Sequence, residues 1–199
     1  MPNKLVVFVE GPDDEKFFEE VLKPFFKGRH KTISHVKYAR ANDETVNKII
    51  GRLADRKDSV YIFTADLDEP PRLLYKSTYS TKHAKLLREH TEKRTSELKE
   101  KYPNVDEDRI DYVITEIEGW YLAGLDDSYC RRCGISLPSS TDDITKQKFE
   151  QIRERSKRKR IDRSLFLAEI LLPPNFSPET AKKKNKSFRN FLSKYNCHL

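Results

Sequence analysis

The sequence has no long apolar run. None of its apolar stretches approaches the roughly 18 residues that a membrane-spanning helix needs. The stretch Met1-Pro-Asn-Lys4 is followed by only five apolar residues, which is too short a run for a signal peptide. We therefore expect a cytoplasmic protein without a membrane attachment.

Cysteine is also scarce, with only Cys130, Cys133 and Cys197 in the chain. The two-residue gap between Cys130 and Cys133 is typical of a zinc hairpin or of a redox pair. A four-ligand zinc site needs two more ligands, and Cys197 and His198 are the nearest candidates by residue type. A zinc site, a redox pair and three incidental thiols are the alternatives. None of the five histidines has a metal-binding spacing, so none is assigned a role.

Charge, by contrast, is plentiful, and it is unevenly distributed. The 199 residues include 39 basic and 32 acidic side chains, which gives a net charge of +7. This excess suits a polyanionic partner such as nucleic acid, although a basic surface that only maintains solubility is the alternative. Acids collect at Glu10–Glu20, Asp66–Glu69 and Asp106–Glu118, and bases collect after residue 146. An acidic pocket with basic surroundings is what metal-dependent phosphodiester chemistry needs.

Two apolar runs end in acids. Leu5–Val9 is followed by Glu10, and Ser59–Asp66 leads on to Asp68. Both runs are rich in β-branched and aromatic residues, which indicates strands buried on both faces and therefore a parallel sheet. If the two strands are neighbours, Glu10, Asp66 and Asp68 converge at the carboxyl edge of the sheet. Three ionised carboxylates need a compensating charge there, and a divalent cation with oxygen ligands supplies it.

The apolar pattern predicts an α/β fold with a mainly parallel four-stranded sheet flanked by helices. Residues 1–125 are expected to form the catalytic domain, and residues 126–199 a basic helical C-terminal extension packed on it. The expected strands are 5–9, 32–38, 59–66 and 109–115, and the expected helices are 13–26, one capped by Asn42 or Asp43, 83–102, 145–160, 164–172 and a last one that carries Phe188. The charged stretch Glu89–Lys101 is expected to project into solvent, and Ser139–Asp143 to start a helix.

The acidic motifs resemble those of the Toprim domain. Toprim domains carry a glutamate-glycine after the first strand, here Glu10-Gly11, and an Asp-x-Asp after a later one, here Asp66-x-Asp68. The resemblance covers roughly residues 4 to 125. The spacing from Glu10 to Asp14 is similar to the OLD-type variant, and Glu116-Ile-Glu-Gly-Trp-Tyr-Leu-Ala resembles a signature of small, stand-alone Toprim proteins related to the OLD nucleases. The chain has no Walker A sequence, so whether it works alone or with a separate ATPase subunit is left open.

The resemblance implies a carboxylate cluster that binds one or two Mg²⁺ or Mn²⁺ ions. Asp66 and Asp68 would be metal ligands, Glu10 a ligand or the general acid/base, and Asp14 and Glu118 would serve a second metal or orient a water molecule. The implied activity is a metal-dependent endonuclease that hydrolyses DNA or RNA, with Glu10, Asp66 and Asp68 as catalytic residues. The alternatives are a non-catalytic nucleic-acid-binding or regulatory module, and an effector subunit that needs a partner ATPase. Homo-oligomers are not excluded.

The basic residues of the C-terminal part are candidates for binding the phosphate backbone, with a solvated face as the alternative reading. The predicted nucleic-acid-binding residues are Arg153, Arg155, Lys157, Arg158, Lys159, Arg160, Lys184 and Lys186. Trp120 and Tyr121 are expected to pack in the core, with base stacking as the alternative. Haloacid-dehalogenase phosphatases also carry Asp-x-Asp after a strand. Their pattern has a threonine two residues after the second Asp, and this chain has Pro70 there, which argues against that family.

Overall fold

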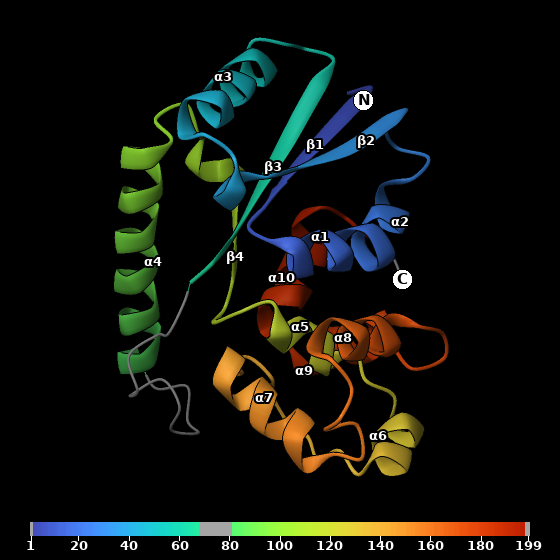
Figure 1. The fold of residues 1–199 in the computed structure, drawn as a ribbon. Coiled ribbons are helices and arrows are strands. Elements are labelled where there is room, and N and C mark those ends of the chain that lie inside the picture. The colour runs from blue at the N-terminus through green and yellow to red at the C-terminus, as the bar shows by residue number, and fades with distance from the viewer. Residues whose placement is uncertain (1, 68–80, 198–199) are drawn as a thin grey trace. The chain divides into compact units, whose positions relative to one another are not determined.

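The computed structural model of the chain describes residues 2–67 and 81–197, apart from the side chains of residues 81–84. The predicted catalytic residue Asp68 therefore lies outside the described residues. The fold is α/β, with a parallel four-stranded sheet flanked by helices and a helical C-terminal region (Figure 1). The predicted fold class is confirmed. No helix in the described ranges is both long enough and apolar enough to cross a membrane.

The chain divides into two compact units, Met1–Tyr112 and Val113–Leu199. This boundary lies earlier than the predicted one after residue 125. The reason is helix α5 (Glu118–Ala123), whose residues are all buried and which contacts later helices of the second unit. The segment that resembles the Toprim-associated tryptophan signature therefore belongs to the second unit.

The elements of the first unit follow the predicted alternation of strands and helices. In chain order they are β1 (Lys4–Val9), α1 (Pro12–Phe17), the π-helical turn η1 (Phe18–Leu22), α2 (Lys23–Phe26), β2 (Thr32–Lys37), the 3-10 turn η2 (Tyr38–Arg40), α3 (Asp43–Ala54), β3 (Ser59–Asp66), α4 (Thr81–Lys101), the 3-10 turn η4 (Glu107–Arg109) and β4 (Ile110–Val113). The strands lie in the order β2-β1-β3-β4, and β1 pairs in parallel with both β2 and β3.

Strand β1 is buried on both faces, as predicted. Val6 and Phe8 point into a cluster that also holds Phe63 of β3, Ile50 of α3 and Tyr102. The opposite face is covered by α1 and η1, whose Phe17 and Phe18 are almost completely buried. Figure 1 shows α3 and α4 on one side of the strands and α1 and α2 on the other. Helices on both faces explain why an unbroken apolar run marks this strand.

Helix α3 begins where its cap residue predicts. The side chain of Asn42 accepts hydrogen bonds from the backbone N–H of Glu44 (2.9 Å) and of Thr45 (3.3 Å). Val46 and Ile50, one turn apart, are fully buried against the sheet. Capping and helical spacing therefore agree on this element.

Helix α4 does not project freely, contrary to the expectation from its charge. Leu98 is only 4% exposed and belongs to the core cluster of the first unit. The hydroxyl of Thr95 forms a hydrogen bond of 2.7 Å with the hydroxyl of Tyr112. Only the outer face is solvated, and its charges pair along the helix, for example Arg88 with Glu92. A few inward contacts at helical spacing are enough to dock a helix that is polar overall.

The second unit is helical. It contains α5, α6 (Asp127–Cys133), α7 (Lys146–Arg155), α8 (Arg163–Leu171), α9 (Pro178–Lys184) and α10 (Lys186–Lys194). Trp120 and Tyr121 are buried, so core packing is confirmed for both. The indole N–H of Trp120 donates to the hydroxyl of Ser187 at 2.7 Å, and its ring meets Phe188 edge to face.

The helix start expected at Ser139–Asp143 is wrong. Helix α7 begins at Lys146, and the hydroxyl of its cap residue Thr145 accepts from the backbone N–H of Lys148. The carboxylate of Asp142 accepts instead from the backbone N–H of Lys186 at 2.7 Å. Asp142, which local spacing assigned to a helix start, is therefore engaged by Lys186, a residue far away in the sequence.

The predicted helical stretch 145–160 is also too long, because α7 ends at Arg155. The guanidinium of Arg153 donates to the carbonyl oxygen of Ile161 at 2.8 Å. This bond holds the chain beyond the helix in a turn. Helix α9, which carries Lys182, Lys183 and Lys184 in its last turn, was not expected from the sequence.

A charged network joins η1 to β2. His35 of β2 lies between two carboxylates, with Nε2 at 2.7 Å from Glu15 and Nδ1 at 3.0 Å from Glu19. Lys23 also contacts Glu19 at 2.6 Å. Burial raises the pKa of Glu19, but the hydrogen bonds from Lys23 and His35 outweigh it, and the pKa of Glu19 lies below its ordinary value of 4.5.

We predict that Glu19→Gln lowers the free energy of unfolding at pH 7 by about 0.5 kcal/mol, because the pair is partly exposed. A depressed carboxyl pKa stabilises the fold above pH 4.5 and loses that effect as the pH falls below it. The difference between the wild type and Glu19→Gln should therefore shrink in acid. Urea unfolding between about pH 3 and pH 7 measures it, and Glu20→Gln is the matched control because Glu20 is exposed. An equal loss of stability in both variants would contradict the prediction.

Candidate active site

The carboxyl edge of the sheet is where β1, β2 and β3 end, after Val9, Lys37 and Asp66. The chain leaves β1 toward β2 on one side and returns to β3 on the other side of β1. The two crossovers therefore run in opposite directions, which creates a topological switch point between β1 and β3. Open parallel sheets bind ligands in the crevice at the carboxyl ends of the strands at such a point.

Glu10 and Asp66 both lie at this switch point. Phe8 of β1 is paired with Phe63 of β3, so continuing the register places Glu10 beside the last residues of β3. The hydroxyl of Thr64 donates to the carbonyl oxygen of Phe8 at 2.8 Å and holds the two strand ends together. Asp66 is only 3% exposed, and Glu10 is half-buried. The predicted convergence of these two carboxylates at one edge is what the sheet produces.

Tyr38 is the common neighbour of the acids at the carboxyl edge. It follows β2, it is 4% exposed, and its hydroxyl donates to Oε2 of Glu10 at 3.2 Å. Burial raises the pKa of Tyr38 well above its ordinary value, and the negative charges of Glu10, Asp14 and Asp66 raise it further. One buried hydroxyl therefore lies within electrostatic reach of three of the predicted metal-binding carboxylates. The hydroxyl keeps its proton and stabilises the charge of Glu10 by donating to it.

Asp14 joins the edge from the first turn of α1, where its Oδ2 accepts from the backbone N–H of Gly11 at 3.1 Å. Carboxylate oxygens are hard ligands, and this donor chemistry fits Mg²⁺ or Mn²⁺. Within residues 2–67 and 81–197, however, no three acidic, histidine or cysteine side chains are close enough together to hold an ion in their present rotamers. The donor types fit a divalent cation, and binding one would require these side chains to move together.

Glu118 and Glu116 lie in the second unit, where each has a cationic partner. Glu118 is completely buried, and its Oε1 accepts from the guanidinium of Arg163. Its Oε2 is buried and accepts no hydrogen bond from any described residue. Burial, followed by the charge of Glu118, raises the pKa of Glu116 to about 7, while Lys146 opposes the shift. A carboxyl group with such a pKa exchanges its proton at neutral pH.

The residue before this acidic pair has a strained backbone. Thr115 is fully buried and has a φ of 69°, in the left-handed region that favours glycine. Its hydroxyl donates to the carbonyl oxygen of Asp142 at 2.8 Å, which helps to hold it there. Strain of about 1–3 kcal/mol in a non-glycine residue is typical of functional sites. The stretch Thr115–Glu118 therefore has the character of a site within the second unit.

The predicted nucleic-acid-binding residues fall into two groups. Arg153 pairs with Glu150 at 2.7 Å, Arg158 with Glu169 at 2.7 Å, and Lys184 with Asp127 at 3.6 Å. Lys186 is half-buried at the start of α10. The remaining members are exposed, namely Arg155, Lys157, Lys159 and Arg160. Arg153, Arg158 and Lys184 form ion pairs within the fold, whereas the second group has no acidic partner in the described ranges.

The cysteines form no disulfide, and all three are buried. Burial raises the pKa of the Cys130 thiol, which leaves it in its unreactive protonated form. Within the described ranges no group of three possible metal ligands includes a cysteine, and His198 lies outside them. Buried free cysteines pack as small apolar side chains.

Sequence reasoning assigned no role to His90, yet this side chain reaches the end of β3. Its Nε2 donates to the carbonyl oxygen of Leu67, next to Asp66, at 2.6 Å. Tyr38 was missed as well, although it is the last residue of the expected strand 32–38. Both contacts join segments far apart in the chain, so neither spacing nor composition indicates them.

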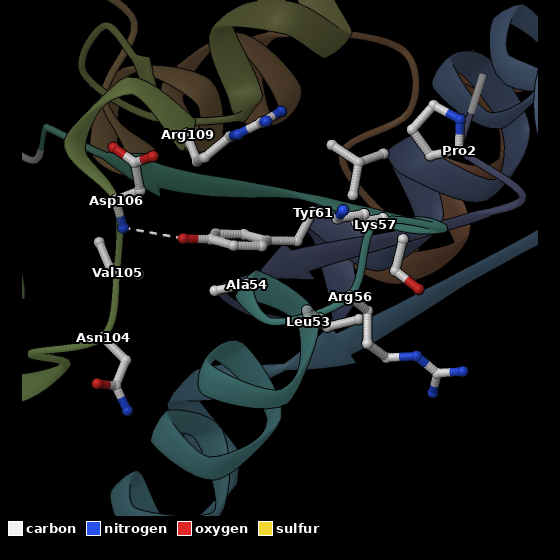
Figure 2. Close-up of a pocket in the computed structure, with 12 residues that line it drawn as sticks. Pro2, Leu53, Ala54, Arg56, Lys57, Tyr61, Asn104, Val105, Asp106 and Arg109 are labelled. Atoms are coloured by element: carbon white, nitrogen blue, oxygen red, sulfur yellow. Dashed lines mark hydrogen bonds between the residues drawn. The ribbon is translucent and has the colours of Figure 1, made fainter.

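A pocket of about 410 Å³ lies at the opposite, amino ends of the strands. Figure 2 shows Tyr61 at its centre, with its hydroxyl accepting from the backbone N–H of Asp106 at 2.9 Å. Arg56, Lys57 and Arg109 contribute to its lining, but Arg56 already pairs with Asp58. This pocket contains none of the carboxylates at the switch point, so the carboxyl edge is the stronger candidate for a catalytic site.

No family model matches the chain, and comparisons with curated proteins and with solved structures found no match either.

We predict that Arg163→Met destabilises the protein by about 3 kcal/mol, because it leaves the buried charge of Glu118 without its cation. Adding Glu118→Gln should recover most of that loss, since the double variant has no buried charge at this position. Urea denaturation of the two single variants and of the double variant gives the coupling energy. Arg160→Met is the matched control because Arg160 is exposed. Losses that simply add in the double variant would show that the two residues are not coupled.

Proposed function

We propose that the protein is a divalent-metal-dependent nuclease that hydrolyses phosphodiester bonds at the carboxyl edge of its sheet. One observation carries the proposal, namely that Glu10 and the buried Asp66 follow neighbouring parallel strands at the switch point, where the buried hydroxyl of Tyr38 donates to Glu10. Carboxylates gathered in a poorly solvated place repel one another when they are ionised. A site that binds a cation offsets that repulsion.

The roles of the residues follow from their positions. Asp66, buried at the end of β3, would be a metal ligand, and Asp14 would contribute from the first turn of α1. Glu10 would act as a ligand or as the group that accepts the proton of the attacking water, since Tyr38 holds one of its oxygens and leaves the other to a ligand. A bound Mg²⁺ or Mn²⁺ ion would supply Lewis-acid stabilisation of the charge that develops on the phosphate. The resemblance to the OLD-type Toprim nucleases supports the same chemistry.

We predict that Glu10→Gln and Asp66→Asn each abolish metal-dependent cleavage while they leave thermal stability unchanged or raise it. Each substitution removes one of the mutually repelling charges and keeps the shape of the side chain. The measurement is cleavage of supercoiled plasmid, single-stranded DNA and RNA in Mg²⁺, Mn²⁺ or EDTA, together with thermal denaturation of each variant. Asp55→Asn, an exposed acid at the end of α3, is the control and should cut normally.

Three outcomes are distinguishable. Cutting that persists in Asp66→Asn would refute the assignment of the site. A folded wild type that binds Mn²⁺ but cuts nothing would favour the binding module or a subunit that needs a partner ATPase. The absence of Mn²⁺ binding would remove the proposal altogether, and the lack of a preformed three-ligand group among the described residues makes this the first quantity to measure.

Tyr38→Phe tests the hydroxyl separately from the carboxylates. Groups that orient a metal ligand typically contribute about 10–100-fold to metal affinity or activity. We therefore expect the cleavage rate of Tyr38→Phe at low Mn²⁺ to fall by about that factor, and to recover in part as Mn²⁺ is raised. A Mn²⁺ titration of the rate measures this, with Tyr61→Phe as the control because its hydroxyl bonds Asp106 at the other end of the sheet. Equal effects in the two variants would contradict a role for Tyr38 in the site.

A further inference from the structure

The stretch from Arg155 to Arg160, which we call the basic loop, carries five bases in six positions. One of them, Arg158, is neutralised by Glu169 at 2.7 Å. The other four are exposed, namely Arg155, Lys157, Lys159 and Arg160. In the described part of the chain none of these four forms an ion pair with an acidic side chain.

The backbone of the basic loop has a defined conformation. The N–H of Lys157 donates to the carbonyl oxygen of Cys133 at 2.8 Å, and the N–H of Ile161 donates to that of Arg158 at 2.9 Å. Ser156 is buried, and its hydroxyl donates to the carbonyl oxygen of Arg153 at 2.6 Å. The loop is therefore fixed before any ligand arrives, which reduces the entropy lost on binding.

Arg153 and Arg158 stabilise the conformation of the basic loop and do not extend into solvent as free charges. The guanidinium of Arg153 donates to the carbonyl oxygens of Lys159 (3.4 Å) and Ile161 (2.8 Å) and pairs with Glu150. Two of the predicted phosphate-binding residues thus serve as a scaffold for the four exposed ones. This division follows only from the folded structure.

The exposed cations elsewhere provide a contrast. Lys48 pairs with Glu44, and on α4 the cations of Lys85, Arg88 and Lys93 each pair with a glutamate four residues later. Beside the basic loop, Asp162 is occupied by the backbone N–H and the hydroxyl of Ser164, and Glu154 is the other adjacent acid. The loop therefore keeps a net positive field, whereas Lys48 and these three cations of α4 are each balanced by a neighbouring glutamate.

We propose that the basic loop binds the phosphate backbone of nucleic acid through Arg155, Lys157, Lys159 and Arg160. Four cations on a rigid turn match a ligand with closely repeated negative charges, and a duplex carries one charge per about 1.7 Å of its axis. Contacts of this kind position a nucleic acid without reading its sequence. The inference deepens the proposed nuclease function and rests on it for the choice of nucleic acid over other polyanions.

The test measures binding without cleavage. Labelled duplex DNA, single-stranded DNA and RNA of one sequence are titrated with the full chain in EDTA, by fluorescence anisotropy, from about 50 mM to about 200 mM salt. The test variant is R155Q/K157Q/K159Q/R160Q. The matched control is K48Q/K85Q/R88Q/K93Q, which removes the same number of exposed cations but from pairs within helices.

The expected result is a change in salt dependence confined to the test variant. If each of the four cations meets one phosphate, the slope of log K against log salt becomes shallower by about 3.6 for a duplex, or by about 2.8 for a single strand. The wild type then loses on the order of 100-fold more affinity than the variant over that salt range. The control should keep the wild-type slope to within about 1. The substrate class with the largest loss identifies the preferred strandedness.

Two results would overturn the inference. One is an equal change of slope in both variants, which would show that only total charge matters. The other is a wild type that binds vesicles containing phosphatidylserine but no nucleic acid. If binding depends on the loop but no metal-dependent cleavage is found, the proposed function fails while this inference stands. If cleavage requires Asp66 but binding ignores the loop, the reverse holds.

Discussion

The pairing of β1 with a parallel strand on each side is the constraint on which the first unit depends. Because β2 and β3 both run parallel to it, all three strands end at one edge. Helices must then cover both faces, which makes the strand wholly apolar and leaves its polar residues only at its ends. Glu10 is the first residue after the strand that is free of this requirement. The parallel arrangement of the strands therefore brings Glu10 and Asp66 to the same edge of the sheet.

Clustered carboxylates need a hydrogen-bond donor or a positive charge nearby, and the two units provide different partners. In the first unit the hydroxyl of Tyr38 donates to Glu10 without bringing in a positive charge. In the second unit Arg163 neutralises Glu118 directly, and Glu116 responds to its neighbour and to burial with a pKa of about 7. Neutral compensation keeps ligands available to a cation, whereas a buried ion pair primarily fixes structure. This difference is why the carboxyl edge, rather than the acidic pair of the second unit, carries the proposed chemistry.

The basic residues show the same separation of structural and functional tasks. A run of bases is uniform in sequence, yet Arg153 closes a turn through two carbonyl oxygens and Arg158 reaches Glu169. What remains exposed is a smaller set on a preformed loop. Net charge predicts a polyanionic partner in general, and the hydrogen bonds of the fold indicate which side chains would meet it.

The sequence alone determined the order of the strands and main helices of the first unit, because apolar periodicity and caps act over a few residues. The runs Leu5–Val9 and Ser59–Asp66 predicted buried strands, and Asn42 predicted a helix start, as the structure has them. The same reasoning placed Glu10 and Asp66 at one edge. It failed at Ser139–Asp143, where a contact from Lys186 uses the acid that local spacing assigned to a cap.

Only the tertiary structure decided which partners these residues have. Tyr38 meets Glu10 and His90 meets Leu67 across segments that are far apart in the chain. The sequence likewise assigned Trp120 and its neighbours to the sheet domain, whereas α5 belongs to the helical unit. The physical reason is the same in each case. Local patterns record which face of an element is apolar, and the pairing of polar groups depends on how distant elements pack.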